Sequence, residues 1–179
     1  MKRVSLAALP LLILAACSQQ PPVLHETGVE IFTATIMPTQ GNQAEGVVTF
    51  RRTGDGIGVT AHIEGLQPNA QHGFHIHQFG DCTAPDGSSA GGHFNPTGER
   101  HGGRHDNERH IGDMGNLESN AEGVATLEYI DPRLEMDGPH SILGRGMIVH
   151  SQADDYTTQP TGDAGARIGC AVIGVADRG

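Results

Sequence analysis

The sequence has few of the residues on which helical bundles and nucleic-acid-binding proteins depend. It contains no tryptophan, only two tyrosines and five phenylalanines, and a single lysine, Lys2, among its 179 residues. Its formal net charge of −10 argues against nucleic acid as a partner. Glycine and proline, with 26 and 10 residues, are too frequent for a coiled coil and indicate many turns. The length suits one domain with a lean hydrophobic core.

Histidine is the residue type that the chain has in excess. There are eleven histidines, as many as lysine and arginine together. A globular domain does not need that many imidazoles to fold, and imidazole is the commonest metal ligand in proteins. The composition therefore directs attention to metal binding.

The first 16 residues have the pattern of an export signal. Lys2 and Arg3 precede the apolar run Val4–Ala16, which is too short to span a bilayer. The run ends in Leu-Ala-Ala-Cys, which resembles a bacterial lipobox, so we expect residues 1–16 to be removed and Cys17 to carry a diacylglyceryl group. Residues 17–27 then form a flexible tether, and residues 28–179 form the folded domain. An ordinary secretory signal with a chance cysteine is the alternative.

Both interpretations export the chain, and lipidation would anchor it to a membrane of the cell envelope, in the periplasm or at the outer membrane. Loss of residues 1–16 leaves no lysine and nine arginines against 21 carboxylates, a formal charge of −12. Attraction of an anion must therefore come from particular arginines or from bound metal.

Cys82 and Cys170 remain as an even pair. In an exported chain one disulfide is the simplest interpretation, with two free thiols as the alternative.

The rest of the chain consists of short segments rich in β-branched residues and separated by turn residues. None shows a sustained helical period, and Thr53–Gly56 is a hairpin signal between two of them. Eight short strands in one domain predict an all-β antiparallel sandwich or barrel. The expected strands are Val29–Met37, Gly46–Arg52, Ile57–Glu64, His72–Phe79, Met114–Glu118, Gly123–Ile130, Ile142–His150 and Ile168–Ala176.

Two long segments have little strand character. Gly80–Gly112 has 33 residues and Ser151–Arg167 has 17. Loops of this length are uncommon in a compact domain and are usually functional or disordered. The first loop carries four of the histidines and Cys82, so we expect it to be ordered around metal.

The spacing of the histidines supports this expectation. His75 and His77 are two residues apart on an expected strand, so their rings point to one face, about 6–7 Å apart, and can grip one metal ion. A polar stripe facing solvent is the alternative for this pair alone.

Three histidines and an aspartate in and after the long loop suit a tetrahedral Zn²⁺ site. These residues are His93, His101, His110 and Asp113. His150 ends a later strand, and the whole set, rich in nitrogen and free of thiolate, suits Cu(II) and zinc.

Six motifs in this order resemble the copper/zinc superoxide dismutase family. The resemblance covers Val29 to Ala176. The motifs are His72–Asp81 (HGFHIHQFGD), Gly92–Pro96 (GHFNP), His101–Gly103 (HGG), Arg109–Asn116 (RHIGDMGN), Gly144–His150 (GRGMIVH) followed by Ala153–Asp155, and Gly162–Gly174 (GDAGARIGCAVIG).

The resemblance implies an eight-stranded Greek-key barrel with two functional loops, and one copper and one zinc ion per subunit. The implied copper ligands are His75, His77, His93 and His150. The implied zinc ligands are His93, His101, His110 and Asp113, so that His93 would bridge the two ions as an imidazolate. Asp154 would orient one copper histidine and one zinc histidine. Arg167 would bind the substrate anion beside the copper, and Cys82 and Cys170 would form the disulfide of the family.

The same resemblance implies an enzyme, with Arg167 and His93 as catalytic residues. It would convert two superoxide anions and two protons to O₂ and hydrogen peroxide by alternating Cu(II) and Cu(I), and so protect the cell envelope. The alternative is a non-catalytic, copper- and zinc-buffering envelope lipoprotein on the same fold. Such a relative would be expected to lack a ligand or the arginine, and this chain lacks none. A structural lipoprotein would not explain the copper histidines.

Two features beyond the ligand set also follow from the comparison with the family. The second loop is shorter than in many eukaryotic members and has no lysine, so lysine guidance of the substrate at that rim is in doubt. Arg100, Arg104 and Arg109 could substitute, although solvated side chains are the expectation for all three. The segments Phe79–Gly80 and Val172–Val175 resemble the apolar surface through which eukaryotic members pair, which predicts a homodimer through that face.

The remaining histidines are not expected to bind metal. His72 opens the first motif but is expected to be packed and hydrogen-bonded. Four others fall outside the ligand pattern, namely His25, His62, His105 and His140.

Overall fold

The computed structural model describes residues 31–176, and these residues are almost entirely β-structure. The strands are β1 (Ile31–Pro38), β2 (Glu45–Thr53), β3 (Gly56–Glu64), β4 (Gln71–His77), β5 (Asp113–Glu118), β6 (Ala125–Asp131), β7 (Gly146–His150), β8 (Arg167–Val172) and β9 (Gly174–Val175). A single 3₁₀ turn, η1 (Ser88–Ala90), is the only helical element in this range. None of the described residues belongs to a helix long and apolar enough to cross a bilayer. The predicted signal peptide, the lipidated Cys17 and the tether lie outside the described residues.

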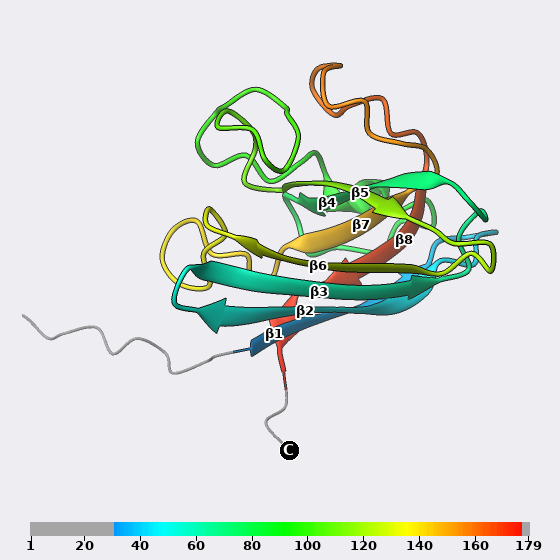
Figure 1. Cartoon of the computed structure of the whole chain (residues 1–179), viewed down its shortest axis with the longest axis horizontal. Coiled ribbons are helices and arrows are strands. Elements are labelled where there is room, and N and C mark those ends of the chain that lie inside the picture. The colour runs from blue at the N-terminus through cyan, green and yellow to red at the C-terminus, as the bar shows by residue number, and fades with distance from the viewer. Residues whose placement is uncertain (1–30, 177–179) are drawn as a thin grey trace, which may run out of the picture.

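The strands form an antiparallel barrel that is closed except at one seam. The hydrogen-bonded order is β5-β4-β7-β8-β1-β2-β3-β6, and β9 adds to β1 (Figure 1). The two end strands β5 and β6 meet only through an isolated bridge between Ser119 and Ala125. Consecutive strands β3 and β4 are not neighbours in this order, and neither are β6 and β7, which is a Greek-key connectivity. The predicted eight-stranded all-β barrel is therefore confirmed.

The alternation of side chains along the strands separates a hydrophobic core from the outer face. In β3 the residues Ile57, Val59, Ala61 and Ile63 are buried while their neighbours are not. Strands β4 and β7 differ, because almost all of their residues are buried. One face of these strands packs into the barrel, and the other lies beneath the two long loops. This second, covered face is where polar side chains can be buried.

The C-terminal strand and the strand before it are shorter than the sequence predicts. The segment expected as one strand, Ile168–Ala176, is divided into β8 and β9 at Ile173. The backbone of Ile173 bonds to Gly144 and Arg145 of the preceding loop instead of to a strand. Arg145 N–H also donates to the carbonyl of Ile142, a turn that delays the start of β7 to Gly146.

Candidate metal centre

Two groups of potential metal ligands converge on the outer face of β4 and β7. Within each group the ligand atoms lie within 4.8 Å of one another, and all of the residues are buried. One group is His75, His77, His93 and His150, and the other is His93, His101, His110 and Asp113. These are the two sets that the sequence predicts, and they are the only such groups in the part of the chain that the structure describes.

Strand geometry explains how the first group forms. Phe74 and Ile76 point into the hydrophobic core, so His75 and His77 point outward, beneath the loops. His150 is the last residue of β7, which pairs with β4. A bulge in the β4–β5 pairing lies between Gly73 and His75. A Cβ atom at Gly73 would lie 2.6 Å from the Cβ of Ala164 and 3.1 Å from the His75 ring, so glycine is required there.

The second group is organised around one oxygen of Asp113. The Nδ1 atoms of His93, His101 and His110 lie 2.8, 3.0 and 3.2 Å from Asp113 Oδ1. The other oxygen, Oδ2, accepts hydrogen bonds from the backbone N–H groups of Gly102 and His110, at 3.0 and 2.9 Å. These two bonds hold the carboxylate so that Oδ1 faces the three rings.

These distances fit a tetrahedral zinc ion. Zinc bonds of about 2.0–2.1 Å place the ligand atoms about 3.3 Å apart. The Oδ1–Nδ1 distances are close to this value, and His93 Nδ1 and His110 Nδ1 are 3.4 Å apart. Three N–H donors on one carboxylate oxygen would exceed its two lone pairs. A cation among the four atoms satisfies all of them.

The first group fits a nitrogen-bound ion equally well. His77 Nδ1 donates to the carbonyl of Gly91 at 2.9 Å, and His150 Nδ1 donates to that of Gly165 at 3.2 Å. The Nε2 atoms of these two rings therefore carry lone pairs, and they lie 3.4 Å apart. His75 Nδ1 and His93 Nε2 are buried and have no hydrogen-bond partner. Four imidazole nitrogens without another role suit Cu(II).

His93 belongs to both groups because its two ring nitrogens face different sides. Nδ1 faces Asp113 and His110, whereas Nε2 faces the first group. The centroids of the His93 and His75 rings lie 4.0 Å apart, with the ring planes tilted by 34°. One imidazole can thus contribute a ligand atom to each ion.

Asp154 forms a hydrogen bond with one ring of each ligand group. Its Oδ2 accepts a hydrogen bond from His75 Nε2 at 2.7 Å, and its Oδ1 accepts one from His101 Nε2 at 2.9 Å. Asn116 holds the backbone of Asp154 at both its N–H and its carbonyl. A Cβ atom at Gly162 would lie 1.9 Å from Asp154 Oδ1, so only glycine leaves room for this carboxylate. One carboxylate therefore fixes the orientation of a ring in each group.

Burial and nearby carboxylates set the protonation states of the ligand rings. Burial lowers the pKa values of His75, His77 and His150, and it lowers that of His93 to about 4. These rings are therefore neutral at pH 7. Burial also opposes the charge on His101, but hydrogen bonds to Asp113 and Asp154 raise the pKa of its ring to about 9. The two carboxylates therefore favour positive charge at this ring, and a metal ion that binds there would replace the proton.

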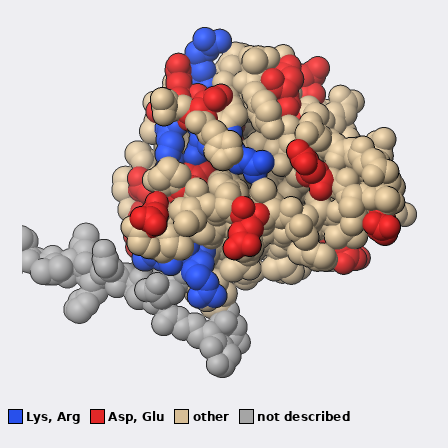
Figure 2. Space-filling view, in the orientation of Figure 1, with Lys and Arg blue, Asp and Glu red and all other residues tan. Residues whose placement is uncertain are grey.

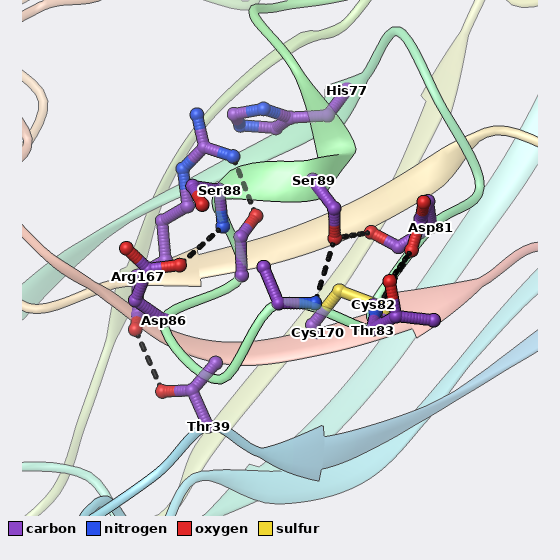
Figure 3. Close-up of a disulfide and its surroundings, with 12 residues drawn as sticks. Thr39, His77, Asp81, Cys82, Thr83, Asp86, Ser88, Ser89, Arg167 and Cys170 are labelled. Carbon is purple, nitrogen blue, oxygen red and sulfur yellow. Dashed lines mark hydrogen bonds between the residues drawn. A yellow bond between two sulfur atoms is a disulfide. The ribbon is translucent and has the colours of Figure 1, made fainter.

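Arg167 lies beside the first group. It is the first residue of β8, and its guanidinium lies next to the His77 ring (Figure 3). Nη1 donates to the carbonyl of Gly87 and Nη2 to that of Gly91, both at 2.6 Å. Gly91 O therefore accepts hydrogen bonds from both Arg167 and His77.

A disulfide holds the loop that supplies these carbonyls. Cys82 and Cys170 are bonded, with their Cα atoms 5.9 Å apart, so the predicted disulfide is confirmed. It ties the start of the long loop to β8 (Figure 3). Ser89 closes the loop on itself, since its hydroxyl donates to Asp81 O and accepts from Ala84 N–H.

The expectation that Arg109 is a solvated surface residue is wrong. Its side chain is 1% exposed, and it forms a two-point ion pair with Asp131 at 2.7 and 2.8 Å. Its Nη1 lies within hydrogen-bond distance of three carbonyls in the turn that carries two ligands of the second group, those of His110, Ile111 and Asp113. Arg109 is thus a structural link between that turn and β6. The only sequence feature related to this ion pair is the aspartate at the end of a strand, Asp131, and that feature does not predict its partner.

Other histidines lie where the sequence predicts. His72 is buried, donates from Nδ1 to the carbonyl of His150 at 2.8 Å, and belongs to neither group. His62, His105 and His140 also belong to neither group, and His62 instead contacts Glu64 at the surface. His25 lies outside the described residues.

Comparison with known proteins agrees with the geometry. The sequence model of the family described as copper/zinc superoxide dismutase (SODC) matches residues 44–173. A protein named Cu-Zn superoxide dismutase from Onchocerca volvulus is 39% identical over 155 residues, which cover 80% of this chain and 96% of the relative. Another of that name from Candida albicans is 45% identical over 142 residues, which cover 75% of this chain and 92% of the relative. The chain therefore belongs to the copper/zinc superoxide dismutase family.

Proposed function

We propose that the protein is a superoxide dismutase, an oxidoreductase that converts two superoxide anions and two protons to O₂ and hydrogen peroxide. The observation that carries this proposal is the pair of ligand groups that share His93 and lie beside Arg167. Membership of the family supports it independently. In the cell envelope such an activity would protect the cell from superoxide.

The two ligand sets divide the chemistry. Copper would be held by His75 Nδ1, His77 Nε2, His93 Nε2 and His150 Nε2, and zinc by Asp113 Oδ1 and the Nδ1 atoms of His93, His101 and His110. When bound, copper supplies one-electron exchange between Cu(II) and Cu(I), and zinc supplies a fixed charge without redox chemistry. His93 Nε2 is the atom at which the chain would hold the proton that is passed to the product. On the other side of the same ring, the contact of His93 Nδ1 with Asp113 fixes the orientation of the ring.

Arg167 is the group that would attract and position the substrate. The mature chain is strongly acidic, so a superoxide anion needs a local positive charge. Two backbone carbonyls hold the guanidinium beside His77, so it is fixed in place before the anion arrives. A guanidinium also presents several N–H donors to a small anion.

Replacement of Arg167 by alanine should lower kcat/KM for superoxide by about tenfold, because one charge-assisted hydrogen bond to the substrate is lost. Both metals should remain bound, since no ligand atom changes. The measurements are steady-state superoxide consumption and metal content. Arg51→Ala removes the same charge from an exposed site on β2 and should have little effect. Loss of copper from Arg167→Ala would contradict the role assigned to this arginine.

The direct test of the function is superoxide consumption by the mature protein loaded with copper and zinc. We expect high activity that cyanide abolishes, because cyanide is a strong ligand for copper and would compete with the substrate. A non-catalytic copper- and zinc-buffering lipoprotein would bind both ions on the same residues without turnover. Full metal occupancy with no activity would favour that alternative.

The apolar face around Phe79 is proposed as a homodimer interface. Phe79, Leu143 and Val172 are large apolar residues that are 50%, 45% and 45% exposed. Gly80 lies against both Gly144 and Val172, since a Cβ atom there would be 2.2 Å from Gly144 O and 2.9 Å from Val172 Cγ1. These residues thus form a continuous surface with the predicted segments Phe79–Gly80 and Val172–Val175. Light scattering at micromolar concentration should give twice the monomer mass, and a monomeric mass would contradict the interface.

Export and lipid anchoring complete the proposal. The disulfide between Cys82 and Cys170 is consistent with an oxidising compartment outside the cytoplasm. The sequence pattern that ends at Cys17 supports a lipid anchor in the cell envelope, facing the periplasm or at the outer membrane.

A further inference from the structure

A cavity with three arginines in its lining lies away from the metal centre, where the loop before β5 folds against the end of β6. Its volume is about 280 Å³. Arg104, Arg109 and Arg133 line it, together with Tyr129 and Asp106. None of the residues of the two metal-ligand groups lines it. The cavity is therefore a separate feature of the fold.

Three of its lining residues have a buried polar atom without a hydrogen-bond partner. In residues 31–176, seven buried side-chain nitrogen or oxygen atoms lack a partner. Four of them belong to histidines in and next to the metal centre. The other three are Arg104 Nη1, Arg109 Nε and Tyr129 Oη, and all three residues line this one cavity. Buried polar groups are rarely left unpaired, so this coincidence indicates a missing acceptor.

The charge balance shows what kind of acceptor is missing. Arg109 is paired with Asp131, and Arg133 with Glu99. Arg104 forms no ion pair with any of the described residues, although its Nη1 is buried. A buried guanidinium N–H without an acceptor is costly, and an anion would satisfy this donor and also balance the charge of the side chain, whereas a water molecule would satisfy only the donor.

The remaining acidic residue in the lining does not supply this counter-ion. Asp106 lies more than a salt-bridge distance from Arg104, and its Oδ2 accepts a hydrogen bond from Gly103 N–H at 2.8 Å. Figure 2 shows basic side chains on the left side of the molecule, which is also the side of the loop before β5, with carboxylates among them. The charge of Arg104 is thus left without a counter-ion among the described residues.

The position of Arg104 is set by the open seam of the barrel. Its guanidinium carbon lies 5.3 Å from the centre of the Tyr129 ring on β6. A Cβ atom at Gly115 on β5 would lie 3.5 Å from Arg104 Nε. Arg104 therefore packs across the gap between β5 and β6, where no ladder of backbone hydrogen bonds forms. Burial and the nearby Asp131 raise the pKa of Tyr129, so its hydroxyl keeps a proton to donate.

We propose that this cavity binds a small oxyanion such as inorganic phosphate. The anion would accept hydrogen bonds from Arg104 Nη1, Tyr129 Oη and Arg109 Nε, and would neutralise the charge of Arg104. A guanidinium matches the geometry of an oxyanion with two or more oxygens. Because Arg109 also contacts the turn that carries His110 and Asp113, the bound anion would stiffen that turn.

The test is calorimetric titration of the metal-loaded full-length protein with inorganic phosphate, against chloride at the same ionic strength. We expect saturable binding of one phosphate per chain, and binding at least about tenfold weaker in Arg104→Gln, since a charge-assisted pair is lost. Tyr129→Phe keeps the ring and should weaken binding by a smaller factor. Arg100→Gln removes the same charge from an exposed position in the same loop and should leave the affinity unchanged.

One further variant separates this cavity from the metal centre, where Arg167 could also attract an anion. Binding through the cavity should persist in Arg167→Ala. Phosphate binding that is lost in Arg167→Ala and retained in Arg104→Gln would assign the anion to the metal centre and overturn the proposal. Absence of saturable binding in the unaltered protein would do the same, and would leave water as the occupant.

Discussion

Asp154→Asn should weaken both metal sites, lowering metal affinity by about 10–100-fold. The carboxylate accepts an N–H from His75 on one oxygen and an N–H from His101 on the other. An asparagine has only one oxygen and presents N–H donors in place of the second. It can therefore orient one of the two rings but not both, and its neutral side chain removes a negative charge behind the ions. The measurement is competition for zinc and for copper with chelators of known affinity.

Asp155→Asn is the matched control. Asp155 is the next residue and is exposed, and its carboxylate accepts hydrogen bonds from the backbone and side chain of the Thr157–Thr158 turn. The same change of charge and shape there should leave both affinities unchanged. Equal affinities in Asp154→Asn and the unaltered protein would show that the carboxylate is dispensable for orienting the rings.

The fold was predictable because the strands are short, rich in β-branched residues and bounded by turn residues, and because some, such as β3, alternate clearly. Ile57, Val59, Ala61 and Ile63 alternate with polar or small residues, and the structure buries all four. The boundaries were less predictable. Ile173 has the composition of a strand residue, but its backbone bonds to a loop that is distant in sequence. The residues around Ile173 in the sequence do not indicate that its backbone will bond to this loop.

The ligand sets were predictable for a different reason. Histidines are costly to bury without a partner, and their spacing on a strand fixes which face they share. The structure brings together all of the residues that the motifs indicate. The supporting groups were harder to foresee. Gly91 acts through its carbonyl, which every residue possesses, and its role depends on how the disulfide loop folds back on β8.

Arg109 shows the limit of sequence reasoning most clearly. In a polar loop, an arginine that will be buried has the same local sequence as one that will be solvated. Only the return of the loop to β6 brings it to Asp131. The ion pair is then enclosed, since Arg109 and Asp131 are both 1% exposed. Removal of one partner of this buried pair should therefore cost more free energy of unfolding than removal of one partner of an exposed pair.

Arg109→Met should lower the free energy of unfolding by about 3–5 kcal/mol, because it leaves the buried charge of Asp131 without a partner. It also removes the donors to the carbonyls of His110, Ile111 and Asp113. The measurement is denaturant unfolding of the metal-depleted protein with its disulfide intact, so that differences in metal affinity do not contribute.

Two variants make this result specific to the buried pair. Arg52→Met disrupts the partly exposed pair with Asp137 and should cost at most about 1 kcal/mol. The double variant Arg109→Met with Asp131→Leu removes both buried charges and should recover part of the lost stability, because the penalty lies mainly in the unpaired carboxylate. If the double variant is instead less stable than Arg109→Met by the full cost of a second independent substitution, the two residues do not act as a pair. The stability of this region would then come from the bonds of Arg109 to the backbone of the turn alone.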